Sequence, residues 1–303
     1  MSMALEQEPT AQAGWDLAQG DEIVPGLTAM RLLGGGSAYE AYLAFDDLLY
    51  TPVVVKLVRP DQVEDPSTLR GLEREVDMLG RLNHPAIVRG FRADLGGARP
   101  YVVLENLDGP RLSSLIRRHG ALPLQQLLPL GIELAAAAHY LRQLEVVHLD
   151  IKPGNIIMGA PAKLIDLSVA RSSADAAELV TPIGTDPYMA PEQCMPGRPL
   201  APCSASDVWG IGATLFHALT GRRPFGRGRD DVAATDAERW PQLVSAPAAM
   251  PPRVPEDVAA TVLACLSPHP QLRPTPAELA DAFEGPMAAL PKPRLGGWKN
   301  SLR

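Results

Sequence analysis

The residues between positions 148 and 166 carry the side chains best suited to chemistry. Asp150 is followed two residues later by Lys152 and three residues after that by Asn155, and Asp166 comes beyond a short apolar stretch. A carboxylate can accept the proton of an attacking hydroxyl, and an ammonium group can neutralise charge on a phosphoryl group in transit. Carboxylate and amide oxygens are the ligands that Mg²⁺ prefers. Singly, Asp and Asn in a Pro/Gly loop are most often turn formers, but the four together predict phosphoryl transfer.

The hydrophobic pattern predicts the elements that must hold these side chains. From residue 22 to about 105, alternating and β-branched runs such as 53–58 predict strands, and the apolar spacing over 67–82 predicts one helix. Further helices are expected at 112–119, 124–144, 205–219, 256–265 and 276–283. We therefore expect an α+β chain with a strand-rich part at 22–105, a helical part at 108–284, and loose segments at 1–21 and 285–303.

Composition excludes several functional classes. The 303 residues are 46% hydrophobic and 21% charged, with a formal net charge of −7, so no uniform basic field is available for nucleic acid. Three cysteines without C-x-x-C spacing indicate neither a disulfide framework nor a zinc site. No apolar run is long enough for a membrane anchor, and the N-terminus does not read as a signal peptide. We expect a cytoplasmic protein, and no pattern specifies an oligomeric state.

A second group of polar residues lies upstream, in the strand-rich part. Lys56 ends the run Val-Val-Val-Lys, Glu75 lies on the predicted helix, and Gly34, Gly35 and Gly36 precede both. A lysine that ends an apolar strand is usually a surface residue, and a glycine run usually marks a hairpin. Glycines also allow backbone N–H groups to approach phosphates closely.

These two groups together resemble the Hanks-type bacterial serine/threonine protein kinase family. The run His-Leu-Asp-Ile-Lys-Pro-Gly-Asn at 148–155 is similar to the family's H-R-D-x-K-x-x-N, and Asp-Leu-Ser at 166–168 is similar to its D-F-G. The segment 184–192 resembles the family's substrate-binding segment with its terminal A-P-E. The resemblance covers about residues 22 to 283 and implies an α+β, bilobal protein-kinase-like fold. It also implies an enzyme that transfers phosphate from ATP to serine or threonine hydroxyls of protein substrates, including its own by autophosphorylation.

The resemblance also implies a role for each matched residue. Asp150 is expected to be the base, Mg²⁺ (or Mn²⁺) is expected on Asn155 and Asp166, and Glu192 is expected to pair with Arg273. The other expected catalytic residues are Lys152, Lys56, Glu75 and Thr185. The expected ATP-binding residues are Gly34, Gly35, Gly36, Ala41, Val54, Lys56, Leu104, Glu105, Leu107 and Ile157.

Several positions depart from the family pattern. Leu149 replaces the arginine that normally pairs with a phosphate on the activation segment, and Ser168 replaces a glycine. Tyr39 stands where the family usually has its third loop glycine. Two alternatives therefore stay open: a pseudokinase that binds nucleotide without turnover, and a small-molecule phosphotransferase on a related fold. Lys152, Thr185 and the A-P-E segment speak against the second alternative.

Overall fold

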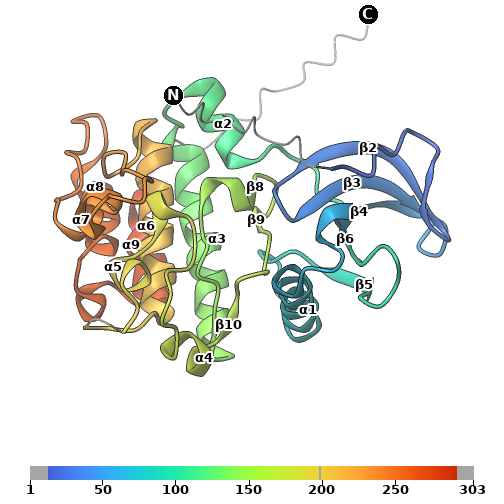
Figure 1. Cartoon of the computed structure of the whole chain (residues 1–303). Helices are drawn as coiled ribbons and strands as arrows, with labels where there is room; N and C mark the ends of the chain where they lie inside the picture. The colour runs from blue at the N-terminus through green and yellow to red at the C-terminus, as the bar shows by residue number, and fades with distance from the viewer. Residues whose placement is uncertain (1–12, 198, 292–303) are drawn as a thin grey trace, which may run out of the picture.

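The computed structural model describes residues 13–197 and 199–291, which form two lobes (Figure 1). The smaller lobe is a six-stranded antiparallel sheet in the order β1-β2-β3-β4-β6-β5, with one long helix beside it. Its elements are β1 (Glu22–Val24), β2 (Leu27–Gly35), β3 (Tyr39–Asp46), β4 (Thr51–Val58), α1 (Pro66–Arg81), β5 (Gly90–Asp94) and β6 (Tyr101–Glu105).

Strand β4 shows how the sheet places a functional side chain. Val53, Val55 and Leu57 are fully buried on one face, where they pack against residues of β1 and β3. Successive side chains of a strand point to opposite faces, so Lys56 lies on the other face, toward α1. Asp65 caps the start of helix α1, because its carboxylate accepts hydrogen bonds from the backbone N–H groups of residues 67 and 68. Its buried face includes Glu75.

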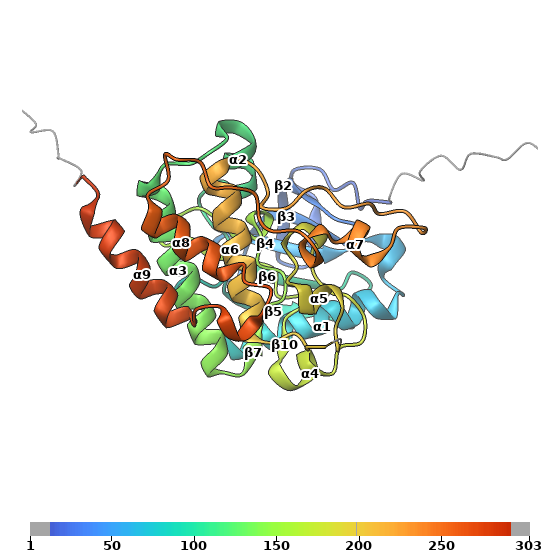
Figure 2. The ribbon, with the colours of Figure 1, turned by 90° about the vertical axis from the view of Figure 1, so that its left-hand side faces the viewer.

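The larger lobe is built around α6 (Ser204–Thr220), which is buried along most of its length and lies among neighbouring helices (Figure 2). Helix α3 (Leu124–Gln143) and helix α8 (Glu256–Cys265) pack against it, and α9 (Pro276–Ala289) packs against α3. A Cβ at Gly131 of α3 would lie 2.7 Å from the Phe283 ring of α9, so glycine permits this close approach. The remaining helices are α2 (Leu112–His119), α4 (Ser173–Ala177), α5 (Pro191–Cys194) and α7 (Asp236–Arg239).

Four short strands form two separate pairs, which contact helices of the larger lobe. β7 (Val146–Val147) pairs with β10 (Arg171–Ser172), and β8 (Ile156–Ile157) pairs with β9 (Lys163–Leu164). The expected α+β fold with two lobes is confirmed. None of the helices in the described ranges combines the length and the apolar composition needed to cross a membrane.

The expected loose ends need correction where the structure describes them. Residues 13–21 pack onto the smaller lobe: Trp15 donates from its indole nitrogen to the Val58 carbonyl (2.7 Å), and the Arg99 guanidinium lies 4.6 Å from the Trp15 ring centroid. Helix α9 continues through Gly285 to Ala289. Trp15 and several backbone hydrogen bonds, among them Gly20 N–H to the Ala29 carbonyl (2.8 Å), hold the first segment, and the continued helix holds the second. The parts of the two segments at 1–12 and 292–303 lie outside the described residues.

Candidate active site

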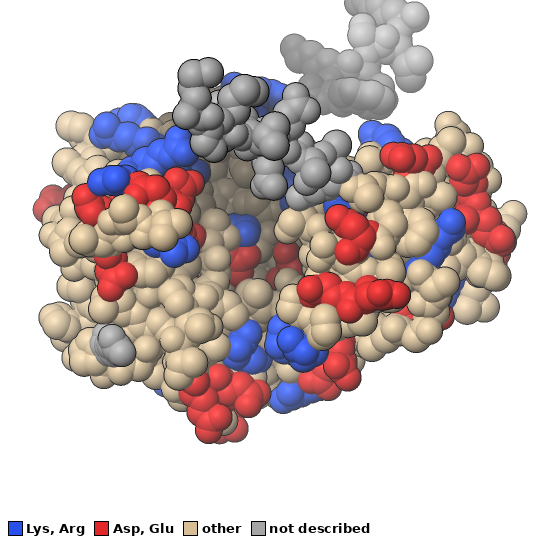
Figure 3. All heavy atoms as spheres, viewed as in Figure 1, with Lys and Arg blue, Asp and Glu red and all other residues tan. Residues whose placement is uncertain are grey.

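Lys56, Glu75 and Asp166 meet between the two lobes. The Lys56 ammonium lies 2.6 Å from Glu75 Oε2 and 2.9 Å from Asp166 Oδ1, which joins β4, α1 and the segment after β9. Lys56 is 13% exposed and Glu75 is fully buried. Figure 3 shows both acidic and basic atoms inside the hollow that separates the lobes. The structure thus brings together three residues that are up to 110 positions apart in the sequence.

The charges of these three residues shift one another's pKa values. Burial alone would lower the pKa of Lys56, but the carboxylates of Glu75 and Asp166 outweigh it and raise that pKa. Burial would likewise raise the pKa of Asp166, but the Lys56 charge and hydrogen bonds from Lys56 and Ser168 hold it well below its usual range. Lys56 therefore stays cationic and Asp166 anionic at neutral pH, as phosphate and metal binding require.

The second group is centred on Asp150. Thr185 donates from its hydroxyl to Asp150 Oδ1 (2.7 Å), and Lys152 donates to Asp150 Oδ2 (2.7 Å) and to the Thr185 hydroxyl (2.5 Å). The Asn155 amide nitrogen also donates to Asp150 Oδ2 (3.0 Å). These bonds fix the orientation of the Asp150 carboxylate, which is 12% exposed and can meet an incoming hydroxyl.

Asn155 comes directly before β8, and Asp166 follows β9, the strand that pairs with β8. The Ile165 N–H donates to the Asn155 carbonyl (2.8 Å), which fixes the two segments side by side. The Asn155 side chain uses its nitrogen toward Asp150, so its oxygen is the group it can offer to a cation. Ser168 donates to Asp166 Oδ1 (2.8 Å), the oxygen that also receives Lys56. One amide and one carboxylate fit the way Mg²⁺ is held beside phosphate oxygens.

The backbone around Asp150 is held by residues of the larger lobe. The Asp207 carboxylate of α6 accepts hydrogen bonds from the N–H groups of His148 (2.8 Å) and Leu149 (2.9 Å). Gln193 of α5 donates from its amide to the carbonyls of Leu149 (2.7 Å) and Ile183 (3.0 Å). Gln193 was not among the expected site residues. Its only signal was its position beside the A-P-E run.

Leu149 occupies an apolar cluster instead of a basic one. It is 3% exposed and shares the cluster with Val147 and with four residues of the segment between Asp166 and Glu192, which corresponds to the family's activation segment. Those four are Val169, Ala176, Leu179 and Ile183. Leu149 has φ 66° and Asp166 has φ 68°, both in the left-handed region that side chains rarely adopt. Such conformations persist where surrounding contacts over-determine them, typically at functional sites.

The expected glycine loop is a tight hairpin between β2 and β3. Gly34 pairs with Ala41 and Gly35 with Glu40, while the Gly36 N–H donates to the Tyr39 carbonyl (3.0 Å). A Cβ at Gly35 would lie 2.5 Å from that carbonyl, so only glycine fits there. Ala41 in turn pairs with Lys56 across β3 and β4, which places the hairpin next to the lysine.

Of the nucleotide-binding residues expected near the connection between the lobes, some pack together as expected and one does not. Val54 pairs with Leu104 across β4 and β6, and both pack in the cluster that includes Leu107. The Glu105 side chain differs from the expectation, because it accepts hydrogen bonds from Lys163 (2.5 Å) and from the Arg89 N–H (2.8 Å). A contact from Glu105 to a nucleotide would therefore have to come from its backbone.

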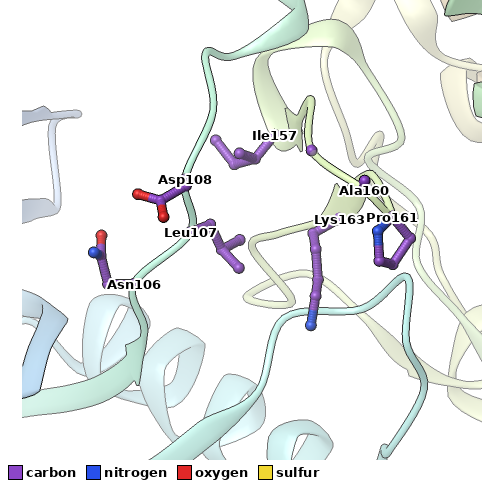
Figure 4. A pocket seen from close by; sticks show the side chains of 8 residues that line it. Asn106, Leu107, Asp108, Ile157, Ala160, Pro161 and Lys163 are labelled. Atoms are coloured by element: carbon purple, nitrogen blue, oxygen red, sulfur yellow. The ribbon is translucent and has the colours of Figure 1, made fainter. Parts of the chain in front are cut away.

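A cavity of about 240 Å³ borders this connection (Figure 4). Two of the expected nucleotide-binding residues, Leu107 and Ile157, line it together with Lys163 and Pro161. Its lining lacks the glycine hairpin, Val54 and Lys56. The cavity is therefore adjacent to the site of the charged residues and does not contain it.

The expected pair of Glu192 and Arg273 is fully buried below the substrate-binding segment. The Arg273 guanidinium makes a bidentate contact with the carboxylate at 2.6 and 2.9 Å. Further hydrogen bonds run from Arg273 to the carbonyls of Ala205 (2.9 Å) and Ser267 (2.9 Å). This pairing joins the segment before α6 to the loop before α9.

Comparison with known proteins agrees with this geometry. A family model described as protein kinase domain matches residues 27–283. The serine/threonine-protein kinase PknB of Mycobacterium tuberculosis is 33% identical over 254 residues, which are 80% of this chain and 40% of that protein. PknB of Mycobacterium leprae is 34% identical over 203 residues, covering 64% of this chain and 32% of that protein. A probable serine/threonine-protein kinase of Streptomyces coelicolor is 33% identical over 255 residues, which are 80% of this chain and 37% of that protein. The chain spans about two-fifths or less of the length of these relatives.

Proposed function

The chain belongs to the protein kinase family, of the Hanks-type bacterial serine/threonine kind, and we propose that it transfers the γ-phosphate of ATP to serine or threonine hydroxyls of proteins. The observation that carries this proposal is the group around Asp150, in which Lys152 and Thr185 fix the carboxylate at 2.7 Å each. Autophosphorylation and a cytoplasmic location form part of the proposal.

The residues of the chain divide the chemistry between them. Asp150 would accept the proton of the substrate hydroxyl as that oxygen attacks, and Lys152, 2.7 Å away, would balance negative charge on the transferred group. Lys56 would hold the nucleotide's phosphates while Glu75 keeps its ammonium group oriented. Most of the rate gain in such reactions comes from positioning and charge stabilisation.

The donor set fits a magnesium–nucleotide complex. Asn155 and Asp166 would hold Mg²⁺, which supplies charge neutralisation at the phosphates when bound. The glycine hairpin at 34–36 would let the backbone approach the phosphates closely, because it carries no side chains that intrude. Val54, Leu104, Leu107 and Ile157 would supply apolar contact to the base, with Ala41 beside them, and Glu105 would contribute only its backbone. These assignments remain part of the proposal.

The test is transfer of labelled phosphate from ATP·Mg²⁺ to casein by the purified chain, followed by phosphoamino-acid analysis. We expect phosphoserine and phosphothreonine, and loss of both with Asp150→Asn. Binding of ATP without transfer would instead indicate a binding module of the pseudokinase kind. Transfer to an aminoglycoside but not to protein would indicate a small-molecule phosphotransferase. No observation in the described residues favours either of these over the protein kinase.

A further inference from the structure

The Tyr39 side chain makes two contacts that the reaction chemistry described above does not use. It is the first residue of β3, directly after the glycine hairpin, and its side chain reaches over Lys56 to helix α1. Its hydroxyl donates to the Thr68 carbonyl on α1 (2.7 Å), and the Lys56 ammonium lies 4.5 Å from the centroid of its ring. One side chain thus connects the hairpin, the phosphate-binding lysine and the helix that carries Glu75.

Helix α1 is shaped to receive the tyrosine. A Cβ at Gly71 would lie 2.8 Å from the Tyr39 hydroxyl, closer than real Cβ atoms come to other heavy atoms. Gly71 is a buried helical glycine, and glycine costs about 1 kcal/mol relative to alanine in a helix. That cost has a local reason, since only glycine leaves room for the hydroxyl. Thr68, Gly71 and Glu75 occur at i, i+3 and i+7, so they share one face of the helix.

We propose that Tyr39 is a positioning residue that holds α1 where Glu75 can pair with Lys56, with Gly71 as its receiving site. The hydrogen bond to Thr68 fixes the helix two turns before Glu75, and the aromatic ring lies against the lysine ammonium. The inference deepens the proposed kinase function and rests on it, since positioning matters only if Lys56 holds phosphates.

The chemistry of the phenol suits a permanent link. Burial raises the pKa of Tyr39 to about 12, with smaller opposing effects from neighbouring charges, so its hydroxyl remains a donor at all physiological pH values. Tyr39 is therefore a fixed link, and pH should not switch it.

The experiment is a double-mutant cycle of Tyr39→Phe and Gly71→Ala. Tyr39→Phe removes the hydroxyl and keeps the ring over Lys56, and we expect kcat to fall roughly three- to tenfold, the value of one hydrogen bond. Gly71→Ala should displace the tyrosine and lower kcat at least as much. In the double variant the added methyl group meets no hydroxyl, so we expect its kcat to equal or exceed that of Gly71→Ala alone.

Two matched controls come from the same elements. Tyr42→Phe on β3 also removes a buried hydroxyl, whose partner is Glu40 (3.2 Å), and it lies away from α1. Gly80→Ala lies on α1 with open space around the added Cβ. Both controls should leave kcat unchanged. A merely structural role for Tyr39 would lower the melting temperature as Tyr42→Phe does and leave kcat intact.

Hydrogen exchange of the amides of residues 68–75 provides a readout that does not need catalysis. We expect faster exchange in Tyr39→Phe and in Gly71→Ala than in Gly80→Ala. Additive effects of the two substitutions, or unchanged exchange and kcat in Tyr39→Phe, would overturn the inference. A wild-type chain that transfers no phosphate but shows the expected exchange pattern would overturn the proposed function and leave the link between Tyr39 and α1 standing.

Discussion

The apolar cluster around Leu149 predicts that the activation segment needs no phosphate to hold its place. In the family, an arginine at this position pairs with a phosphorylated residue of the segment. Here Leu149 contacts Val169, Ala176, Leu179 and Ile183 of the segment, and burial replaces the ion pair. We expect phosphatase-treated protein to keep kcat within about tenfold of the untreated protein, which corresponds to about 1.4 kcal/mol.

The magnitude of the cluster's contribution follows from its burial. Leu149 is 3% exposed, and replacing a buried leucine by alanine costs about 2–5 kcal/mol. Three of its partners are only partly buried and can relax, so about 2–3 kcal/mol is expected for Leu149→Ala. That loss should loosen the segment and lower kcat although Ser172, Ser173 and Thr181 remain available for modification. Leu149→Met conserves volume and should cost less than about 1.5 kcal/mol.

The assay compares single-turnover rates and urea denaturation of wild type, Leu149→Ala, Leu149→Met and a variant with Ser172, Ser173 and Thr181 all replaced by alanine. Leu149→Arg completes the set and should not raise activity, because it places an unpaired cation in an apolar pocket. A collapse of activity on phosphatase treatment, or a large gain with Leu149→Arg, would refute the reasoning. Arg74 and Arg171, whose positive charges lie close enough to interact, would then be the candidates for binding the phosphate.

Three further predictions concern the base, the metal residue and the buried ion pair. Asp150→Asn should lower kcat by at least about a hundredfold in single-turnover assays with an unaltered melting temperature, and near-normal transfer would remove Asp150 as the base. Asp166→Asn should abolish the Mg²⁺-dependent part of the thermal shift caused by ATP, whereas a retained shift would place the metal elsewhere. Arg273→Met should cost about 3–5 kcal/mol in urea denaturation because it strands the Glu192 carboxylate, and Arg273→Met with Glu192→Gln should recover part of that loss.

Sequence patterns located the polar residues better than the ends of the elements. The helix expected at 67–82 spans 66–81, because Asp65 and Pro66 form a recognisable start. The apolar residues Ile87 and Val88 do not belong to β5 (Gly90–Asp94), because they bond instead to Leu164 of β9. Short apolar runs do not reveal where hydrogen-bonded pairing begins. Helices α4, α5 and α7 each have five residues or fewer, too few for a periodic signal.

Contacts between residues far apart in the sequence could not be predicted from motif spacing. The link from Tyr39 to Thr68, the docking of Trp15 on Val58 and the amide of Gln193 on Leu149 all depend on tertiary placement. Tyr39 was visible only as a departure from a glycine, and Gly71 carried no signal at all. Glu105 was expected among the nucleotide-binding residues, but its side chain accepts a hydrogen bond from Lys163.

Three of the departures from the family pattern share a physical consequence. Tyr39 bonds α1, Ser168 bonds Asp166, and Leu149 is buried against the activation segment, so each departure adds a contact within the assembled site. Two hydrogen bonds of about 1 kcal/mol and one buried leucine of about 2 kcal/mol sum to a bias of about 4 kcal/mol. That bias corresponds to a population ratio of roughly a thousand for the assembled arrangement over one that lacks all three contacts. A regulator that opens this site would have to prefer the open arrangement by at least that factor.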